Sequence, residues 1–362
     1  MSAAIPVVAI GAGRVAHAAH LRELRALDDQ LRLAAVVEVD GARLDALRSA
    51  FAGVMVCATV EEAVRAGARA ALCLTPWWTH RDVTEECLRL GLPVLCEKPV
   101  SLDPMDIDAL MDAEKRSGVP VSVGYMKRHD PIVARFVRHI REHAGTARRI
   151  SVTINDPNSP EQIEHLLPRF VSGVRRYSPD QAAAVERALG PDAHPVQREV
   201  YARGLGGSLI HQVNIVQEAL SWHGLELLNR LRLCSQWARG TAVACQWQPA
   251  DGLMVEMSHA RLPEHRTYRE RIECVGERSV ATLRMPSPYS RDLGASLDID
   301  TWDATGVCRS DRFTAVPGRT GFRMQLRSWA KSLAGDPDVA MPGLSEARRD
   351  VEILREAALA VS

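Results

Sequence analysis

The sequence lacks the features that mark several classes of protein. No apolar run approaches the length that spans a bilayer, and the first residues show neither the basic region nor the apolar stretch of a secretory signal peptide. Lysine plus arginine and aspartate plus glutamate number 45 each, so no excess of one charge favours binding to nucleic acid or to an anionic membrane. We therefore expect a cytoplasmic protein with no nucleic-acid and no membrane partner.

The cysteines and histidines also lack metal-binding patterns. The eight cysteines include no CxxC pair, and the 12 histidines are scattered. Cys57, Cys73 and Cys96 fall within or at the ends of predicted core strands, where a reduced thiol packs as a small hydrophobic group. We interpret them as buried thiols in a reducing compartment, and we expect no metal site.

The length of 362 residues is too great for one compact core, so we expect two domains. From residue 5 to about 124, strand and helix patterns alternate with short connections, which predicts a parallel sheet covered on both faces. The second half contains strand-like runs that alternate polar and apolar residues, which predicts a mainly antiparallel open sheet. These runs are 150–154, 231–237, 242–247, 253–259, 269–275 and 280–285, followed by helical stretches at 320–334 and 344–360.

The first strand-like run leads directly into a glycine-rich turn. Residues 6–10 are apolar, the turn reads Gly11-Ala12-Gly13-Arg14-Val15-Ala16, and leucines then recur at helical spacing. Gly11 permits a tight turn, and Gly13 lets backbone N–H groups approach a pyrophosphate at the helix N-terminus. The next run, 33–37, ends on Glu38, whose carboxylate can bind ribose hydroxyls. This order predicts a dinucleotide-binding Rossmann domain.

The other predicted strands of this domain end on polar and aromatic residues. Thr75-Pro76-Trp77-Trp78-Thr79-His80 follows one strand, Glu97-Lys98-Pro99 follows the next, and the segment 124–131 follows the last. Ligands bind beyond the carboxyl ends of the strands in open α/β sheets, so we expect these segments to line one crevice with the glycine turn. Pro99 favours an extended Lys98, and a partly desolvated lysine there has its pKa drawn toward neutrality, which suits proton exchange with a hydroxyl. The alternative is a solvated Glu97–Lys98 ion pair.

With these motifs the sequence resembles the glucose–fructose oxidoreductase, inositol dehydrogenase and rhizopine-catabolism family (Gfo/Idh/MocA) of NAD(P)-dependent oxidoreductases. The resemblance runs from about residue 5 to 131 and continues more loosely through Gly206-Gly207. Its most specific part is Glu97-Lys98-Pro99 with the preceding segment 91–96. The resemblance implies that Lys98 projects into the active site, with Glu97 beside the nicotinamide.

The second catalytic element departs from the family pattern. Such families carry an Asp and a His four residues apart downstream of the Gly-Gly pair. Here His211 stands at the Asp position and Ile215 at the His position, whereas a shift of one residue brings Asn214 to the latter. We expect His211 either to bond a substrate hydroxyl and shuttle its proton, or to be a packed or capping histidine at a helix start.

These inferences give a fold class and a set of site residues. We predict an α/β protein with a doubly wound Rossmann domain at 1–130 and an α+β domain for substrate binding and oligomerisation at 131–362, whose last helices can pack back on the first. Glu38 favours NAD over NADP because it repels a 2′-phosphate, although Arg43 can weaken that preference. The predicted cofactor-binding residues are Gly11, Ala12, Gly13, Arg14, Val15, Glu38, Thr75, Pro76, Trp77, His80, Glu97 and Lys98. The predicted substrate-binding residues are Lys98, Tyr125, Arg128, His211 and Asn214, of which Lys98 and His211 are catalytic. Two interpretations stay open for a further group of residues: their side chains contact a phosphate or a carboxylate, or they lie at the surface. These residues are Arg169, Arg175, Arg176 and Tyr177.

Three functions stay open. The leading hypothesis is NAD-dependent hydride transfer to or from a secondary alcohol of a sugar, aminosugar or cyclitol. The alternatives are an NADPH-dependent reductase of a nucleotide-linked keto-sugar and a non-catalytic dinucleotide-binding sensor. The run 231–237 places bulky apolar residues at every second position of an open sheet, which predicts a homodimer or homotetramer.

Overall fold

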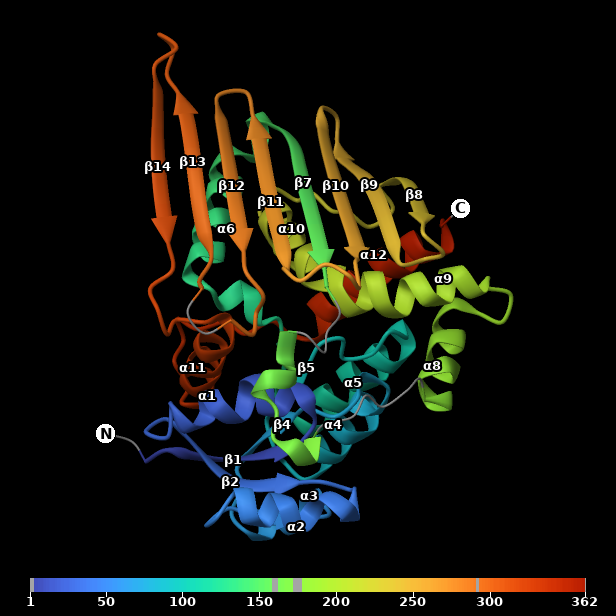
Figure 1. Cartoon of the computed structure of the whole chain (residues 1–362), viewed down its shortest axis with the longest axis vertical. Coiled ribbons are helices and arrows are strands. Elements are labelled where there is room, and N and C mark those ends of the chain that lie inside the picture. The colour runs from blue at the N-terminus through green and yellow to red at the C-terminus, as the bar shows by residue number, and fades with distance from the viewer. Residues whose placement is uncertain (1–2, 158–161, 172–177, 291–292, 362) are drawn as a thin grey trace. The chain divides into compact units, whose positions relative to one another are not determined.

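Two β-sheets, one of six strands and one of eight, organise the part of the chain that the computed structural model describes, residues 3–157, 162–171, 178–290 and 293–361 (Figure 1). Contacts between residues divide the chain into two units. The first comprises Met1–Tyr125, Ile163–Ala182 and Phe322–Arg348, and the second comprises Met126–Gln162, Ala183–Gly321 and Arg349–Ser362. Each sheet belongs to one unit.

The sheet of the first unit has the order β3-β2-β1-β4-β5-β6, and these strands pair in parallel throughout the described residues. This is a doubly wound order: strands β1 to β3 extend the sheet in one direction and β4 to β6 in the other, so the order switches between β1 and β4. Both faces are covered by helices, so the strands are continuous apolar runs, as in the fully buried Val7, Val8 and Ala9. The strands are β1 Ile5–Ile10, β2 Leu31–Val37, β3 Met55–Cys57, β4 Ala70–Cys73, β5 Val94–Glu97 and β6 Val121–Gly124.

Two helices of this unit, α3 and α5, begin at recognisable capping residues. Thr59 and Glu62 form a capping box for α3, and Asp103 accepts a hydrogen bond from the Met105 N–H in front of α5. A π-helical turn at Ala16–His20 lies between the glycine-rich turn and α1. The helices are α1 Leu21–Arg25, α2 Gly41–Ala50, α3 Val60–Arg65, α4 His80–Arg89, α5 Pro104–Ser117 and α11 Gly321–Leu333, most of which lies in this unit.

The sheet of the second unit has the order β14-β13-β12-β11-β7-β10-β9-β8 and is mainly antiparallel, with β7 and β10 paired in parallel. The predicted mixture of a parallel Rossmann sheet and a mainly antiparallel open sheet is therefore confirmed. β13 and β14 were not predicted from the sequence: the edge strand β14 is largely exposed, and β13 carries only a short apolar pattern among acidic residues. The strands are β7 Ala147–Asp156, β8 Leu231–Trp237, β9 Ala242–Ala250, β10 Leu253–Arg261, β11 Arg269–Gly276, β12 Ser279–Met285, β13 Ser296–Trp302 and β14 Cys308–Thr314.

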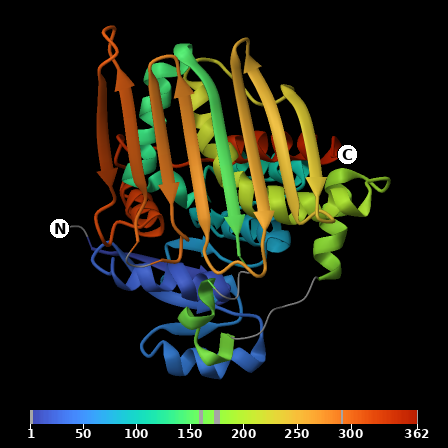
Figure 2. The same ribbon diagram turned by 45° about the horizontal axis from the view of Figure 1, so that its top comes forward.

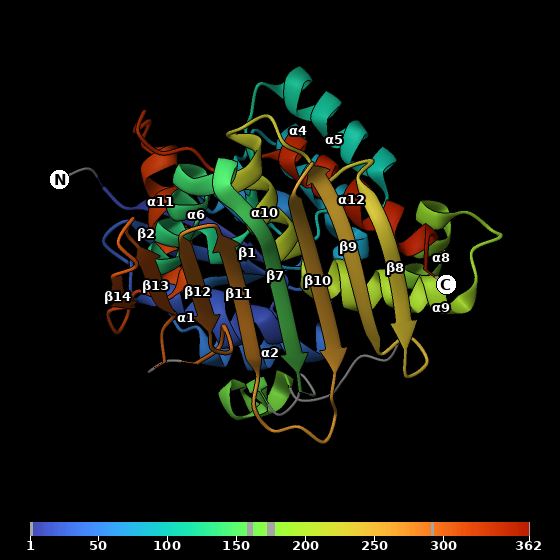
Figure 3. The ribbon, with the colours of Figure 1, turned by 90° about the horizontal axis from the view of Figure 1, so that it is seen from above.

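Helices cover one face of this second sheet. Figures 2 and 3 show α6 and α10 on the same side of it. Asp130 caps α6, and a π-helical segment at Val200–Leu209 packs on β9 and β10, where a Cβ added at Gly204 would lie 3.3 Å from Val243 Cγ1. The helices are α6 Pro131–His143, α8 Pro179–Leu189, α9 Pro195–Glu199, α10 Ile210–Ser221 and α12 Leu344–Leu359, of which α8 and α12 begin in the first unit.

The cysteines agree with the sequence-based interpretation as free thiols. Cys57, Cys73 and Cys96 are buried, as are four others, and Cys308 is exposed. Among the helices of the described residues, none has both the length and the apolar character that a bilayer crossing requires.

Candidate active site

The glycine-rich turn of the first unit has the geometry of a dinucleotide cradle. Gly11 has φ of 91°, and a Cβ there would lie 3.0 Å from the Thr75 backbone nitrogen, so only glycine fits. A Cβ at Gly13 would meet no described atom within 4 Å. The protein's own atoms therefore do not require glycine at position 13, whereas close approach of a phosphate would. Ala16 is fully buried, which keeps the helix against the sheet.

Glu38 lies directly after β2, and its side chain is mostly buried. Its Oε1 accepts a hydrogen bond from the Asp40 N–H at 3.0 Å. Arg43 Nη1 lies 3.7 Å from Glu38 Oε2, and Arg43 Nε lies 3.4 Å from Asp40 Oδ2. The predicted ribose-binding carboxylate thus has a cation beside it, as the position of Arg43 in the sequence suggested.

Arg14, in the glycine-rich turn, pairs with a residue distant in sequence. Its Nη1 lies 3.0 Å from Oε1 of Glu164, which stands in a 3₁₀ turn at Glu164–Leu166. Arg169 begins the next 3₁₀ turn. Arg175, Arg176 and Tyr177 lie outside the described residues.

The loop after β4 is tied to the loop after β5 by His80. The His80 Nε2 atom lies 2.8 Å from the Thr75 carbonyl oxygen, and Nδ1 lies 2.8 Å from the Pro99 carbonyl oxygen. His80 is only 1% exposed, so it braces the two loops from within. Trp77 and Trp78 are partly exposed and meet edge to face, with ring centroids 5.8 Å apart.

Cys73, His80 and Cys96 form a buried group whose sulfur and nitrogen atoms lie within 4.8 Å of one another. Thiolates and an imidazole are ligand types that bind zinc. Both ring nitrogens of His80 face backbone carbonyls at hydrogen-bond distance, so the imidazole is committed to the two loops. His80 thus braces the ends of β4 and β5 beside the two thiols.

Lys98 follows β5 and is partly exposed. Its backbone N–H donates to Oε2 of Glu97 at 3.1 Å, and the Lys98–Pro99 peptide bond is cis. The other oxygen of Glu97, Oε1, lies 2.7 Å from Nε2 of the fully buried His20. The catalytic lysine of the predicted motif is thus anchored at the carboxyl end of the same parallel sheet that carries the glycine-rich turn.

The surroundings of Glu97 keep it ionised. Burial alone would raise the pKa of Glu97, but the hydrogen bond and charge of His20, together with Lys98, outweigh burial and lower it. Gly124 leaves the room for this carboxylate, since a Cβ there would lie 3.3 Å from Glu97 Cδ. His20 was not predicted as a site residue, because the nucleotide-binding pattern in the sequence consists of the glycine-rich turn that precedes it.

Two of the predicted substrate residues of the second unit lie together. Arg128 Nη1 donates to Asn214 Oδ1 at 3.4 Å, and Asn214 Nδ2 donates to Asp350 Oδ2 at 2.7 Å. Asn214 is fully buried, and Arg128 also pairs with Glu218 at 3.2 Å. These contacts hold α10 to Arg128, near the start of the second unit, and to Asp350 on α12. His211, one turn earlier on α10, is 8% exposed, and Tyr125 in the first unit is 1% exposed.

A buried polar network next to His211 was missed by sequence reasoning. Lys127 Nζ lies 2.5 Å from Glu270 Oε2 and donates to the Tyr268 hydroxyl at 3.3 Å, and that hydroxyl donates to Glu270 Oε2 at 2.6 Å. The side-chain amide of Gln212 donates to the other oxygen of Glu270. Tyr268 and Glu270 are two positions apart beside β11, the spacing that points both side chains to one face of a strand. That spacing was the available signal.

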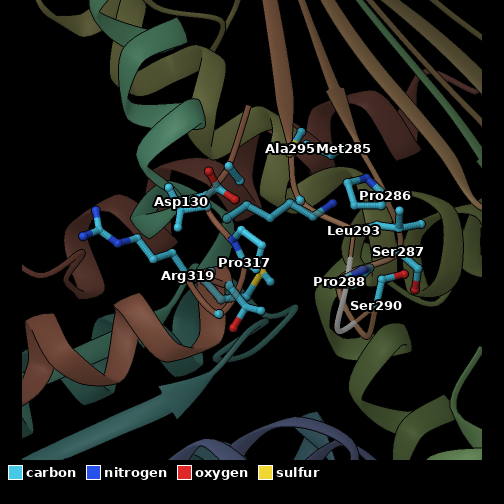
Figure 4. Close-up of a pocket in the computed structure, with 18 residues that line it drawn as sticks. Asp130, Met285, Pro286, Ser287, Pro288, Ser290, Leu293, Ala295, Pro317 and Arg319 are labelled. Atoms are coloured by element: carbon cyan, nitrogen blue, oxygen red, sulfur yellow. The ribbon is translucent and has the colours of Figure 1, made fainter. Parts of the chain in front are cut away.

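Lys127 also lines a pocket that lies wholly in the second unit. The walls combine apolar side chains with a few polar ones, and Figure 4 shows Pro286, Pro288 and Leu293 gathered on one side of it, with Pro317 and Asp130 opposite. Burial raises the pKa of the Asp130 carboxyl, against the hydrogen bonds from the Ile132 and Val133 N–H groups. Apolar walls with few polar groups are typical of small-molecule sites.

Comparison with known proteins agrees with this geometry. Residues 5–125 match the oxidoreductase family described as having an NAD-binding Rossmann fold, Gfo/Idh/MocA. The inositol 2-dehydrogenase of Arthrobacter sp. (strain FB24) is 34% identical over 145 residues, which are 40% of this chain and 43% of that protein. The chain spans less than half of the length of the first curated relatives that it matches.

Solved structures share the fold along nearly the whole chain. The UDP-N-acetylglucosamine 3-dehydrogenase of Acidithiobacillus ferrooxidans superposes with a TM-score of 0.69 at 17% identity, covering 99% of this chain and 98% of that one. A Gfo/Idh/MocA family oxidoreductase of Vibrio cholerae gives a TM-score of 0.66 at 16% identity, covering 98% and 96%. The predicted family resemblance is confirmed over residues 5–125, which match the Gfo/Idh/MocA oxidoreductase family with its NAD-binding Rossmann fold.

Proposed function

We propose that this protein is an NAD-dependent dehydrogenase that oxidises a secondary alcohol of a cyclitol or sugar and catalyses the reverse reduction. The observation that carries the proposal is the placement of Lys98 at the carboxyl end of β5, in the same parallel sheet whose β1 leads into the turn with Gly11 and Gly13. Ligands of such sheets bind at this edge. The curated relatives that match this region are named inositol 2-dehydrogenases, which supports a cyclitol as the substrate.

The residues of the first unit fit a dinucleotide. The turn at Gly11 and Gly13 offers backbone N–H groups and open space for a pyrophosphate, and Glu38 offers a carboxylate for ribose hydroxyls. When bound, NAD supplies the hydride acceptor. A carboxylate binds hydroxyl groups but repels a 2′-phosphate, so Glu38 supports NAD as the cofactor. Arg43, which lies beside Glu38, is the feature that favours the NADPH-dependent alternative.

In this mechanism the protein moves one proton. Lys98 Nζ accepts the proton of the substrate hydroxyl while the hydride leaves the carbon that carries this hydroxyl. In the reverse direction Lys98 returns the proton. Glu97, fixed by His20, positions the Lys98 backbone through the hydrogen bond to its N–H. His211 is proposed as the second group that bonds the substrate, with Tyr125 and Arg128 as further contacts. Because the side-chain amide of Asn214 contacts both Arg128 and Asp350, we propose that Asn214 holds α10 in place.

The polar network and pocket of the second unit support a polyol substrate. Lys127 is fixed by Glu270 and Tyr268, so its charge is held in one place at the pocket wall. Fixed donors and acceptors with locked rotamers suit recognition of several hydroxyl groups by geometry. A nucleotide-linked sugar remains the competing substrate, because a structural relative acts on a UDP-sugar.

A turnover panel tests the proposal. The purified chain is incubated with NAD or NADP and with inositols, free sugars, aminosugars and nucleotide-linked sugars, and formation of reduced cofactor is followed by absorbance. We expect reduction of NAD with an inositol or a free sugar. Turnover only with a nucleotide-linked sugar and NADP would favour the competing substrate. Tight dinucleotide binding without turnover of any substrate would favour a sensor.

A further inference from the structure

Cys234 and Cys245 face each other across strands β8 and β9. They are direct partners in the antiparallel ladder and are only 2% and 1% exposed. Their Sγ atoms lie 2.7 Å apart, closer than the roughly 3.5–4.0 Å at which non-bonded heavy atoms pack best. The proposed dehydrogenase reaction uses neither thiol.

The backbone around the pair holds the two side chains in register. The turn that joins β8 to β9 has positive φ at Ala238, Arg239 and Gly240, which closes a tight hairpin and fixes which residues oppose each other. Residues directly opposite in an antiparallel pair have Cβ atoms about 4.5–5.5 Å apart, near the roughly 3.5–4.5 Å of a disulfide. A cross-link therefore needs little movement of the backbone.

The buried pair joins the edge strand β8 to its neighbour β9, so an oxidant reaches it when β8 opens locally. β8 is the last strand in the order of the sheet and pairs with β9 alone among the described strands. On β8, Leu233 and Trp237 are 50% and 48% exposed. Edge elements with few buried contacts open locally at lower free-energy cost than core strands. Cys73 and Cys96 are also ladder partners, but they lie on the interior strands β4 and β5.

We propose that Cys234 and Cys245 form a disulfide when the protein meets a low-molecular-weight disulfide as oxidant. One thiol loses its proton, and its thiolate attacks the oxidant RSSR, which forms a mixed disulfide and releases RS⁻. The second sulfur, after losing its proton, displaces the remaining RS⁻. In sum, two protein thiols and RSSR give one protein disulfide and two RSH, so two electrons pass to the oxidant.

The bond would fasten the edge strand β8 to β9. The hairpin it closes packs on the segment before α10, since a Cβ added at Gly240 would lie 3.5 Å from the side chains of Val196 and Val200. In a reducing compartment the pair stays as two thiols, and it closes as the supply of oxidant rises. A disulfide restricts the unfolded chain, so oxidation should raise the thermal midpoint by about 5–10 °C.

Peptide mapping of the wild-type protein tests the proposal. The folded protein is incubated with glutathione disulfide, remaining thiols are alkylated, and the digest is analysed by mass spectrometry with and without reduction. We expect a linked peptide pair that carries Cys234 and Cys245, two fewer titratable thiols than in the reduced protein, and a higher thermal midpoint. A pair that stays alkylatable after oxidation, or a different linkage, overturns the proposal.

Variants separate this bond from other thiol chemistry. Cys234→Ser and Cys245→Ser should each abolish the oxidation-dependent rise of the thermal midpoint, whereas Cys308→Ser, at an exposed cysteine, should keep it. A rise that persists in Cys234→Ser contradicts the proposal. Should a variant not fold, the wild-type map decides alone. These readouts do not depend on dehydrogenase activity, so the two proposals can fail separately.

Discussion

His20 and Glu97 are joined by a contact of 2.7 Å between Nε2 and Oε1, and this contact links the π-helical turn after the glycine-rich motif to the residue before Lys98. The second oxygen of Glu97 accepts the Lys98 N–H. The nucleotide-binding turn and the proposed catalytic lysine are thus mechanically coupled through one buried carboxylate.

This coupling predicts a positioning role for His20. His20→Ala leaves the buried Glu97 carboxylate short of a partner, which should lower the free energy of unfolding by about 1.5–3 kcal/mol. It should also lower kcat while leaving KM nearly unchanged, because Lys98 loses its fixed position. His20→Gln, which retains a donor, should restore most of kcat. Denaturant unfolding and steady-state kinetics measure both effects, and a loss of stability with an unchanged kcat would show a purely structural contact.

The stability of the protein should fall on mild acidification because of His139. Burial, and then the charge of His143, lowers the pKa of His139 from 6.5 to about 4. Between these pH values the unfolded chain binds a proton that the folded protein does not, so unfolding is favoured as the pH falls from 6.5 toward 4, by up to about 3 kcal/mol. His139→Gln should flatten this part of the pH dependence, measured by urea unfolding. The exposed His165→Gln is the control, and equal slopes in the two variants would contradict the assignment.

Much of the first unit could be predicted because its signals are local. β1, β2, β4 and β5 are short apolar runs closed by characteristic residues, and a buried parallel strand needs only such a run. β14 was not predicted because an exposed edge strand needs no alternation of polar and apolar residues, and its neighbour β13 has too few apolar residues to stand out. His20 escaped for another reason: its partner Glu97 is 77 positions away in the sequence, and only the folded sheet brings them together.

The second unit shows that residue spacing alone does not predict which partners a polar side chain contacts. Asn214 was predicted as a substrate ligand from its position near His211, and in the structure its side-chain amide contacts Arg128 and Asp350. Lys127, which was not singled out from the sequence, is buried against Glu270. In both cases the partner lies on an element far along the chain, so no local sequence pattern predicts the contact.

Cofactor choice provides a third prediction. The Glu38 carboxylate should repel a 2′-phosphate, so the wild type should bind NAD about tenfold or more tighter than NADP. Glu38→Gln should narrow this ratio by removing the charge. Arg43→Gln should widen it, because the cation that lies 3.7 Å from the carboxylate is lost. Titration calorimetry with both cofactors measures the ratios, and equal affinities in the wild type would overturn the preference.

The open face of the second sheet predicts self-association. α6 and α10 cover one face, and on β8 the side chains of Leu233 and Trp237 remain about half exposed. Pairing of such faces about a two-fold axis would bury them, so we propose a homodimer or homotetramer. Light scattering at micromolar concentration should show a mass of two or four chains, and Leu233→Glu with Trp237→Glu should lower it. Asp298→Asn, a polar change elsewhere on the sheet, is the control, and a monomeric wild type would contradict the proposal.

The central prediction concerns Lys98. If its amine exchanges the hydroxyl proton, Lys98→Met should lower kcat by about 10²–10⁴-fold, and further if the lysine also positions the substrate. NAD affinity, measured by calorimetry, should change little, because the cofactor contacts are proposed for Gly11, Gly13 and Glu38. Lys115→Met, at an exposed lysine of α5, should have no effect on either quantity.

His211 decides how the proton leaves the site. If Lys98 is the principal proton acceptor, His211→Ala should cost less than Lys98→Met, and the double variant should lose little more than Lys98→Met alone, since residues that act as one unit are not additive. Equal losses from the two single variants would make His211 a full partner in proton transfer. A Lys98→Met enzyme that keeps most of its activity would move the proton to His211 or to Tyr125, and the mechanism built on the end of β5 would have to be abandoned.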